Sequence, residues 1–525
     1  MKKVFSLVLA LMFLLSAAAL AGEPVKITDE PAELDIWVSV STSIEDFETN
    51  QTTLWYEEKT GVHVNWTQVS SAETATKFNL SIASNEYPDI YSYALKPDQV
   101  IQYANAGIFI PLNDLIDEHA PNIKAVFDAN PEVREAITAP DGNIYTLLRT
   151  DPATYTLVED KLFVMADWLN AYIEATGNEA PVTLDEFEEM LIYWRDNDMN
   201  GNGEKDEIAI MGSDGGANII RFLASSFQLT PTNYMIVNED NTVSYAPVTD
   251  EFREALIWIN HLYEEGLIAE ETFIQDSTQL KSVVGKEDKS ARTVGSFVGF
   301  WQGVAASPAA MSDAYDAYVA LAPLEGDDGV RQCSSRGFFT LDLCGAITKD
   351  CEDPVLAIKW LDWWFSYDGM IMIDYGMEGI NWEWVDTPAI NGTTPARAFL
   401  TDRNVLQNVH WHVNSVPYYR TIDSLFGRAP TDHVPYLYEG ALVYEPYEVA
   451  QGFPQLAWCT DMDVLNENNE LSTVIGDYIL QALVQFVTGA EDIEDDAAWE
   501  NFKSTLDTLG LERYLETVSI INFGE

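Results

Sequence analysis

The stretch Leu34-Asp-Ile-Trp-Val-Ser-Val40 opens the part of the sequence that decides the fold class. Its side chains alternate between apolar and polar, which is typical of a β-strand. Phe47–Gly61 is then predicted to be a helix closed by glycine, and Val62-His-Val-Asn-Trp66 a second strand. An amphipathic helix and a short strand are predicted next, at Thr74–Ala83 and Glu86–Tyr91. This β-α-β-α-β order predicts a parallel α/β sheet.

The rest of the chain predicts a second α/β set and then a mostly helical part. The predicted elements of the second set are the helices Thr183–Trp194 and Asp250–Glu265 and the strands Gly295–Trp301 and Ala317–Leu321. From about Pro354 the predicted elements are the helices Pro354–Phe365, Leu471–Val487 and Ala497–Leu509. Because no low-complexity linker separates the two sets, we expect the chain to cross between two lobes more than once. A cleft between such lobes is the expected ligand site.

The charge of the chain excludes several classes of partner. Its 525 residues include 85 Asp and Glu against 28 Lys and Arg, a formal net charge of −57. Such a surface repels phosphate backbones and anionic lipids, so we expect no nucleic-acid partner and no docking on a membrane through basic patches. Apolar residues make up 47% of the chain, which is enough for a large core.

The N-terminus predicts secretion. Two lysines precede the apolar run Val4–Leu15, and Ala19-Leu-Ala21 offers a signal-peptidase site, so residues 1–21 are predicted to be a signal peptide. The mature protein is therefore expected outside the cytoplasmic membrane, either associated with the cell surface or periplasmic. Gly22 ends what resembles the start of a lipoprotein signal, but Glu23 stands where the acylated cysteine would be. We therefore expect no lipid anchor.

An acidic loop predicts a calcium site. Asp196-Asn-Asp-Met-Asn-Gly-Asn-Gly-Glu-Lys-Asp-Glu207 matches the pattern D-x-[DN]-x-[DN]-G-x5-E, in which alternate residues supply oxygen ligands and glycine makes the turn. Two registers compete. One uses Asp196, Asp198, Asn200, the Asn202 carbonyl and Glu207, and the other uses Asp198, Asn200, Asn202, the Glu204 carbonyl, Asp206 and Glu207. Regulatory calcium loops of this kind act in pairs, whereas this sequence contains a single loop. The predicted Ca²⁺ is therefore structural. The alternative is a solvated acidic turn.

Enzyme signatures are missing from the sequence. It contains no G-x-S-x-G, H-E-x-x-H, P-loop or G-x-G-x-x-G motif, so we expect no enzyme. The alternative hypothesis is a secreted, calcium-binding glycoside hydrolase or lyase, because 85 acidic residues guarantee carboxylate pairs. A peptide- or polyamine-binding protein fits the charge but not the abundance of aromatic residues. The sequence contains four cysteines, Cys333, Cys344, Cys351 and Cys459, which could pair completely in three ways. We expect at least one disulfide bridge and no disulfide bridge equally.

Taken in order along the chain, a series of short segments resembles extracellular solute-binding protein family 1. This family comprises the binding proteins of ABC-type sugar importers, and the likeness is to its long, calcium-loop-bearing type. The segments are Thr76–Leu80, Ala83–Asp89, Ile110–Leu115, Asp141–Tyr145, Asp167–Leu169, Thr183–Phe187, Asp206–Ile208, Leu262–Ile268, Tyr375–Gly379, Phe486–Gly489 and Leu509–Tyr514.

The resemblance implies an α/β protein with the type II periplasmic-binding-protein fold, two lobes and a helical C-terminal part. Residues 22–150 and 325–367 would form the N-terminal lobe, and residues 151–324 and 368–525 the C-terminal lobe. An oligosaccharide would bind in the cleft between the lobes of a monomer and be delivered to the transmembrane subunits of an ABC permease. In the family the calcium loop binds in the second register, so the resemblance implies the ligands Asp198, Asn200, Asn202, Glu204, Asp206 and Glu207.

Aromatic residues are the candidate ligand contacts, because sugars pack their C–H faces on aromatic rings. Trp301 follows an apolar run and is flanked by Gly299 and Gly303, and in a sugar-binding relative of this superfamily the similar strand ends in a tryptophan that stacks on sugar. We therefore expect Trp301 to be the stacking platform. Further candidates are Trp382, Trp411 and Tyr419, with Tyr91 and Tyr93 of the first lobe facing them.

Overall fold

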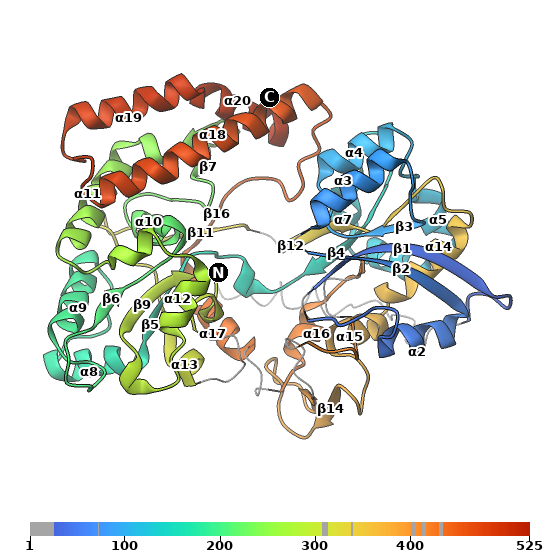
Figure 1. The fold of residues 1–525 in the computed structure, drawn as a ribbon, viewed down its shortest axis with the longest axis horizontal. Helices are drawn as coiled ribbons and strands as arrows, with labels where there is room; N and C mark the ends of the chain where they lie inside the picture. The colour runs from blue at the N-terminus through green and yellow to red at the C-terminus, as the bar shows by residue number, and fades with distance from the viewer. Residues whose placement is uncertain are drawn as a thin grey trace, which may run out of the picture. The chain divides into compact units, whose positions relative to one another are not determined.

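The chain forms two compact units, which are built from three segments each. The computed structural model describes residues 26–524 except 42, 72, 307–312, 338–339, 401–405, 412–415 and 430–433. Unit 1 comprises Met1–Pro152, Thr340–Ala429 and Gln455–Thr460, and unit 2 comprises Ala153–Phe339, Pro430–Pro454 and Asp461–Glu525 (Figure 1). The predicted signal peptide and Glu23 lie outside the described residues.

Unit 1 contains the predicted parallel sheet. Its strand order is β13-β3-β1-β2, where β1 is Ala32–Val40, β2 is Val62–Ser70, β3 is Ile90–Ser92 and β13 is Ala346–Ile347. Strand β1 runs parallel to both β2 and β3, while β13 is antiparallel to β3. The β-α-β-α-β prediction is confirmed here, although helix α2 begins at Gln51 rather than Phe47. Asn50 has extended backbone and its side chain accepts the Thr52 N–H, so it caps the helix at that point.

The remaining elements of unit 1 surround this sheet or follow it in the chain. The helices are α2 (Gln51–Thr60), α3 (Thr74–Ser84), α4 (Pro97–Asn105), α5 (Asn113–His119), α6 (Pro121–Ala129), α7 (Pro131–Ala136), α14 (Pro354–Asp362), α15 (Tyr367–Tyr375) and α16 (Ile422–Phe426). Two antiparallel pairs complete the unit, β4 (Leu147–Asp151) with β12 (Thr340–Cys344) and β14 (Trp382–Val385) with β15 (Ala396–Phe399).

Unit 1 extends further along the chain than the sequence predicts. The N-terminal lobe is expected to end at residue 367, whereas unit 1 keeps residues 340–429. Buried ion pairs give the physical reason, because Asp374 on α15 accepts hydrogen bonds from Arg420 at 2.6 Å and from Arg428 at 2.8 Å. An isolated bridge also pairs Arg149 with Tyr418. The crossing expected at 367 therefore lies after residue 429, and the one expected at 324 lies near 340. Two further crossings, on either side of Gln455–Thr460, follow.

Unit 2 contains a mixed sheet with the order β10-β5-β9-β6. Strand β5 (Lys161–Met165) is antiparallel to both β9 (Val294–Gly299) and β10 (Tyr318–Leu321), and β6 (Ile208–Ile210) is parallel to β9. Every residue of β9 is buried, so this strand lies at the centre of the unit's core. The predicted strand ending at Trp301 is present, but it ends two residues earlier, at Gly299.

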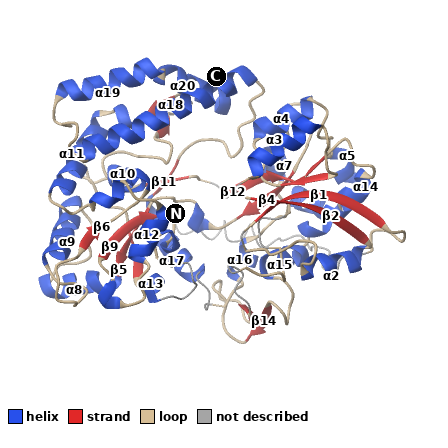
Figure 2. Ribbon diagram, viewed as in Figure 1, coloured by secondary structure: helices blue, strands red, loops and turns tan. Residues whose placement is uncertain are grey.

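Helices cover the sheet of unit 2, and three of them form a separate layer. The helices of the unit are α8 (Ala166–Thr176), α9 (Leu184–Asp196), α10 (Ala217–Ala224), α11 (Asp250–Glu264), α12 (Ser277–Val284), α13 (Asp313–Asp316), α17 (Val434–Tyr444), α18 (Met462–Val487), α19 (Asp496–Leu509) and α20 (Leu511–Phe523). The short strand pairs are β7 (Met235–Val237) with β8 (Val243–Tyr245) and β11 (Cys333–Ser335) with β16 (Glu448–Ala450). Figure 2 shows α18, α19 and α20 lying side by side at the top of the unit.

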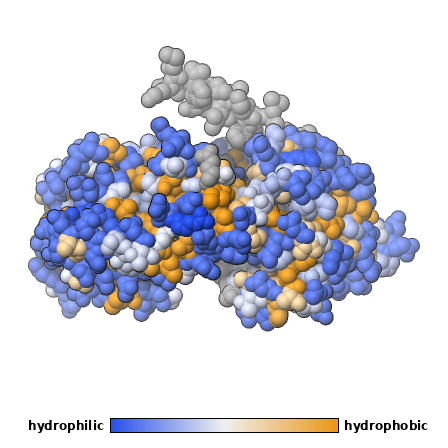
Figure 3. Space-filling model, turned by 90° about the horizontal axis from the view of Figure 1, so that it is seen from above, coloured by the Kyte–Doolittle hydropathy of each residue, from blue (hydrophilic) through white to orange (hydrophobic). Residues whose placement is uncertain are grey.

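The surface carries more hydrophilic than hydrophobic residues. Figure 3 shows one face on which smaller hydrophobic patches lie between hydrophilic residues, as on most soluble domains. None of the helices in the described part of the chain is both long enough and apolar enough to span a membrane. The four cysteines are buried free thiols, so the structure contains none of the possible disulfide bridges between them.

Candidate functional site

A pair of aromatic side chains stands directly after β9 in unit 2. Phe300 is 44% exposed and Trp301 is half-buried. Their ring centroids lie 6.0 Å apart at an interplanar angle of 33°, and the ring of Tyr315 packs against Trp301 with its centroid 6.1 Å away. A strand that is buried along its whole length thus ends in two rings that reach the surface. Such rings can bury the apolar face of a sugar.

The glycines around Trp301 serve the packing of the protein itself. A Cβ atom on Gly303 would come within 2.5 Å of the Trp301 ring, and one on Gly299 within 2.3 Å of Val304. The missing side chains of these glycines make room for Trp301 and Val304. Gln302 is also buried and lies 3.5 Å from the Tyr315 hydroxyl, so its amide is not at the surface.

A small polar cavity lies in the same unit, beside the segment that leads into β5. The cavity has a volume of about 10 Å³, room for one water molecule, and its polar lining includes Glu159, Asp160, Thr230, Thr232, Gln332 and Ser334. Asp160 accepts two hydrogen bonds from Arg221, at 2.9 and 3.1 Å. Burial lowers the pKa of Arg221 and the charge of Asp160 raises it, with a raised pKa as the net result. Glu159 is bonded to Thr232 and Arg336, so both carboxylates are held in place.

Three of the aromatic residues named from the sequence belong to the core of unit 1. Trp411 is 1% exposed, stacks within 4.6 Å of Trp364 and donates its indole N–H to Thr53 at 2.7 Å. Tyr91 is fully buried and its hydroxyl shares a hydrogen bond with Ser81, while Tyr93 is 7% exposed. The structure therefore corrects the expectation that Trp411, Tyr91 and Tyr93 face a ligand. Rings without exposed area have no face to offer.

Of the other two candidates, one is a core residue and the other is half-buried. Trp382 is 4% exposed and donates its indole N–H to the Gly376 carbonyl at 2.9 Å, which again is a core position. Tyr419 is half-buried and donates its hydroxyl to Asn130 at 3.1 Å. In the described part of the chain, three exposed aromatic residues were not among the predicted contacts, namely Phe300 and Trp384, each 44% exposed, and Tyr367, 40% exposed. For Phe300 a signal existed, because an aromatic residue directly after a fully apolar strand has no further strand to cover it.

An open groove of about 720 Å³ lies on unit 1 along α6 and α7. Its lining includes Asp128, Arg134 and Glu135, and its one aromatic residue, Phe127, is 1% exposed. The groove thus offers charged side chains but no ring face, unlike the strand end in unit 2.

The acidic loop after α9 is organised around Asp198. One carboxylate oxygen of Asp198 accepts the N–H groups of Gly201 at 2.8 Å and Asn202 at 3.1 Å, and the other accepts that of Gly203 at 2.9 Å. Gly201 and Gly203 have φ values of 74° and 86°, a conformation that favours glycine. Asp196 lies outside this arrangement, since its carboxylate binds Arg195 at 3.0 and 3.2 Å. These hydrogen bonds favour the register that begins at Asp198 over the one that begins at Asp196.

The donor atoms of the loop fit a calcium ion. Glu207 accepts the Met199 N–H at 2.7 Å through one carboxylate oxygen, while its other oxygen is buried and has no hydrogen-bond partner. A buried, unpaired carboxylate oxygen is costly unless a cation satisfies it. Among the described residues, in this loop and outside it, no three His, Cys, Asp or Glu side chains form a metal-binding group by themselves. Amide oxygens of Asn200 and Asn202 and the Glu204 carbonyl would have to complete the all-oxygen set that Ca²⁺ prefers.

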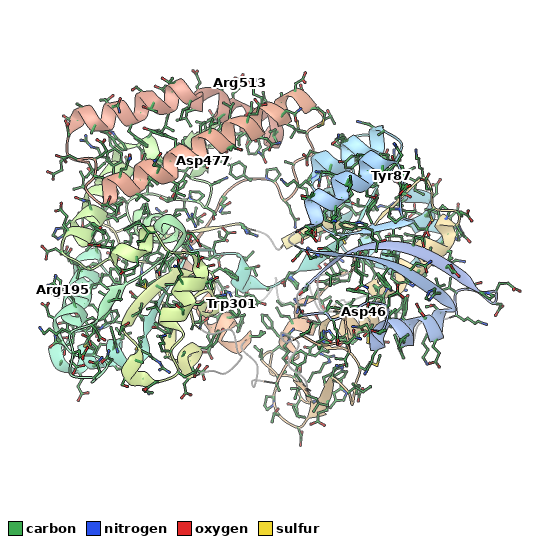
Figure 4. The ribbon with its side chains drawn as sticks, in the orientation of Figure 1. Asp46, Tyr87, Arg195, Trp301, Asp477 and Arg513 are labelled. Atoms are coloured by element: carbon green, nitrogen blue, oxygen red, sulfur yellow. The ribbon has the colours of Figure 1, made fainter. Side chains whose placement is uncertain are left out.

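The loop and the aromatic pair lie in different parts of unit 2. Figure 4 labels Arg195, which precedes the loop, at the left edge of the unit, and Trp301 on the unit's right side. An ion in the loop would therefore act on the stability of its surroundings rather than touch a molecule stacked on Trp301.

Comparison with known proteins gives consistent matches over most of the chain. Residues 55–377 match a family model described as bacterial extracellular solute-binding protein. The fructooligosaccharide ABC transporter substrate-binding protein FusA of Streptococcus pneumoniae is 27% identical over 482 residues, which cover 87% of this chain and 84% of that protein. Lipoprotein LipO of Bacillus subtilis is 24% identical over 63% of each chain.

Solved structures share the fold. FusA of S. pneumoniae in complex with kestose matches with a TM-score of 0.74 at 24% identity, covering 93% of this chain and 98% of that one. An extracellular solute-binding protein from Bifidobacterium longum subsp. infantis matches with a TM-score of 0.76 at 18% identity, covering 94% and 98%. These matches confirm the predicted α/β solute-binding fold.

Proposed function

Since the chain belongs to the bacterial extracellular solute-binding proteins, we propose that it captures an oligosaccharide and delivers it to an ABC importer. The pair Phe300 and Trp301 carries this proposal, because two rings at the surface end of a central strand form a platform for sugar. The relative FusA, whose name states fructooligosaccharide transport, supports the same class of ligand. The expected position of the ligand between the two lobes stays a prediction.

We infer that the protein acts by binding alone, as a monomer whose partners are the transmembrane subunits of a permease. The relatives found are substrate-binding proteins and not enzymes, which supports a role without catalysis. The hydrolase alternative makes a different prediction, since an enzyme would turn its ligand over. Incubation with oligosaccharides and analysis of the sugars by chromatography distinguishes the two, because a binding protein leaves them intact.

The experiment that tests the proposal is a thermal-shift screen against oligosaccharides. Kestose, milk oligosaccharides, N-glycans and alginate oligosaccharides make a suitable panel, since proteins of the same fold are described with these ligands or names. A bound sugar stabilises the native state by RT ln(1 + [L]/Kd), so a ligand should raise the melting temperature in a concentration-dependent way. A panel in which every oligosaccharide leaves the melting temperature unchanged contradicts the proposal.

A structural calcium ion belongs to the same proposal. We propose that Asp198, Asn200, Asn202, Asp206 and Glu207 hold it through side-chain oxygens and Glu204 through its carbonyl. The unpaired oxygen of Glu207 and the turn around Asp198 support this assignment. Bound there, the ion would neutralise carboxylates that otherwise repel one another.

The remaining part of the proposed function is secretion without a lipid anchor. Membership of an extracellular family supports an extracytoplasmic location. We propose that residues 1–21 direct export and that Glu23 leaves no thiol for acylation. Phase partitioning in detergent tests this, since a lipid-modified protein enters the detergent phase and the proposed protein stays in the aqueous phase.

A further inference from the structure

A buried lysine holds the segment that carries the aromatic pair. Lys161, the first residue of β5, is 1% exposed. Its ammonium group donates hydrogen bonds to the carbonyls of Tyr155 at 2.9 Å, of Val158, and of Phe300 at 3.0 Å. The neighbouring carboxylate, Asp160, is paired with Arg221. An ammonium has three N–H donors, so each donor of Lys161 has one main-chain acceptor.

The three carbonyls come from two stretches that lie far apart in the sequence. Tyr155 and Val158 belong to the stretch in which the chain has just entered unit 2, whereas Phe300 follows β9. Register explains the meeting, because Lys161 pairs with Gly299 across the β5–β9 ladder and its side chain reaches the next carbonyl along. The lysine therefore ties the entry stretch of the unit to the end of its central strand.

We propose that Lys161 is a positioning residue for the sugar platform: by binding the Phe300 carbonyl it fixes the backbone from which Phe300 and Trp301 project. This proposal rests on the proposed function and names a residue on which the affinity of the protein for the sugar depends. The strand end needs such a hold, because ladder pairing stops at Gly299 and a glycine also stands at 303. Glycine adds backbone freedom and no side-chain anchor.

The surroundings of the Lys161 ammonium make its charge sensitive to pH. Burial lowers the pKa of Lys161 to about 8, while the nearby Cys333, Asp160 and Glu448 act in the opposite sense. Asp160 is paired with Arg221, and Glu448 accepts a hydrogen bond from Ser335. Burial raises the pKa of Cys333 to about 12. Lys161 therefore changes charge between pH 7 and pH 10.

Deprotonation should loosen the platform while stabilising the fold. A neutral amine has two N–H donors for three carbonyls, so the Phe300 carbonyl is less firmly held above pH 8. The unfolded chain keeps an ordinary lysine pKa of about 10.4. Because the folded pKa is lower, the unfolded state binds more protons in this range and the contribution of Lys161 to stability rises with pH. Opposite trends of affinity and stability would distinguish positioning from a purely structural role.

The test uses Lys161→Met, with Lys289→Met as the matched control. Lys289 lies in the same unit but is exposed and pairs with Asp167 at 3.0 Å. Titration calorimetry with kestose at pH 7 should show affinity lowered about tenfold in K161M, the equivalent of one hydrogen bond to a charged group, and unchanged in K289M. Between pH 7 and pH 9.5 the affinity of the wild type should fall and that of K161M stay level. Equal affinities and equal pH profiles of wild type and K161M would overturn the proposal.

A second measurement needs no sugar and so separates this proposal from the proposed function. The N–H groups of Val304, Ala305 and Ala306 bond back to Trp301 and Gln302. Hydrogen exchange in a peptide covering residues 300–306 should be faster in K161M than in the wild type, and faster in the wild type at pH 9.5 than at pH 7 after correction for the intrinsic rate. If wild type binds no kestose but exchange changes in this way, the sugar is wrong and the positioning role stands. Unchanged exchange in both comparisons overturns the role, and the wild-type arm remains decisive should K161M fail to fold.

Discussion

The tryptophans of unit 1 and the tryptophan at the end of β9 in unit 2 have opposite surroundings. In unit 1, Trp360, Trp364 and Trp411 pack within 6.2 Å of one another and are at most 1% exposed. In unit 2, Trp301 is half-buried beside an exposed phenylalanine. Residue type alone therefore does not identify a sugar contact. The position of a ring relative to the end of its strand explains its exposure, because a side chain beyond the last ladder pair loses cover on one side.

Removal of a core tryptophan should have the largest effect. Trp411→Ala is expected to lower the free energy of unfolding by about 3–5 kcal/mol, because the indole leaves a cavity and Thr53 loses its hydrogen-bond partner. Chemical denaturation measures this. Trp384→Ala is the matched control, since that ring is 44% exposed in the same unit and should cost less than about 1 kcal/mol. Similar losses in both variants would contradict the assignment of Trp411 to the core.

The calcium loop should give the next largest effect. Wild type is expected to melt higher in calcium than in chelator, by the equivalent of about 2.7 kcal/mol at a hundredfold excess over Kd. Asp198→Ala should abolish this gap, because its carboxylate organises the loop. Asp196→Ala is the control that distinguishes the two registers, since Asp196 binds Arg195 instead and the gap should persist. Wild type that melts identically with and without chelator would show an ordinary acidic turn.

The aromatic pair should affect affinity rather than folding. Trp301→Ala is expected to weaken sugar binding by about 1–3 kcal/mol, the scale for one large apolar side chain, with little change in melting. Calorimetry and a melting curve measured on the same sample test this. Gly303→Ala sharpens the comparison, because the added Cβ would lie 2.5 Å from the Trp301 ring and so displace it without removing it. A large loss of stability in W301A with affinity intact would place Trp301 in the core.

The smallest effect is a pH dependence that arises beside the tryptophans of unit 1. Asp362 accepts the Ile123 N–H at 2.9 Å, and burial raises its pKa from 3.8 to about 6. A raised pKa in the folded state means that the contribution of this group to stability is complete below pH 4 and is lost as pH rises through 6. Asp362→Asn should remove that part of the slope, roughly 2 kcal/mol between pH 4 and pH 7. Denaturation curves of both proteins across this range test it, and parallel curves would contradict it.

Local sequence patterns predicted the helices and strands. Contacts between residues far apart in the sequence determine where unit 1 ends and which aromatic rings are buried, and local patterns do not show these contacts. Strands β1 and β2 and helices α3, α9 and α11 follow from alternation, capping residues and periodicity over a few residues. The end of unit 1 could not be predicted in this way, because Asp374 is held there by Arg420 and Arg428, and Trp411 by Thr53, which is 358 residues away in the sequence. The partial exposure of Trp301 follows from a local signal, its place directly after a strand, whereas the burial of Tyr91 depends on rings from distant segments.

The interleaving of the two units in the chain has a consequence for the order of folding. Synthesis proceeds from the N-terminus, and domains ordinarily fold one after another as they emerge. Here residues 1–152 lack the strand β13 and the helices of residues 340–429 that complete unit 1, and unit 2 awaits residues 461–525. Contacts over such separations also form slowly. Unit 1 is therefore incomplete until residue 460 has been made, and unit 2 until the helices of residues 461–525 have been made.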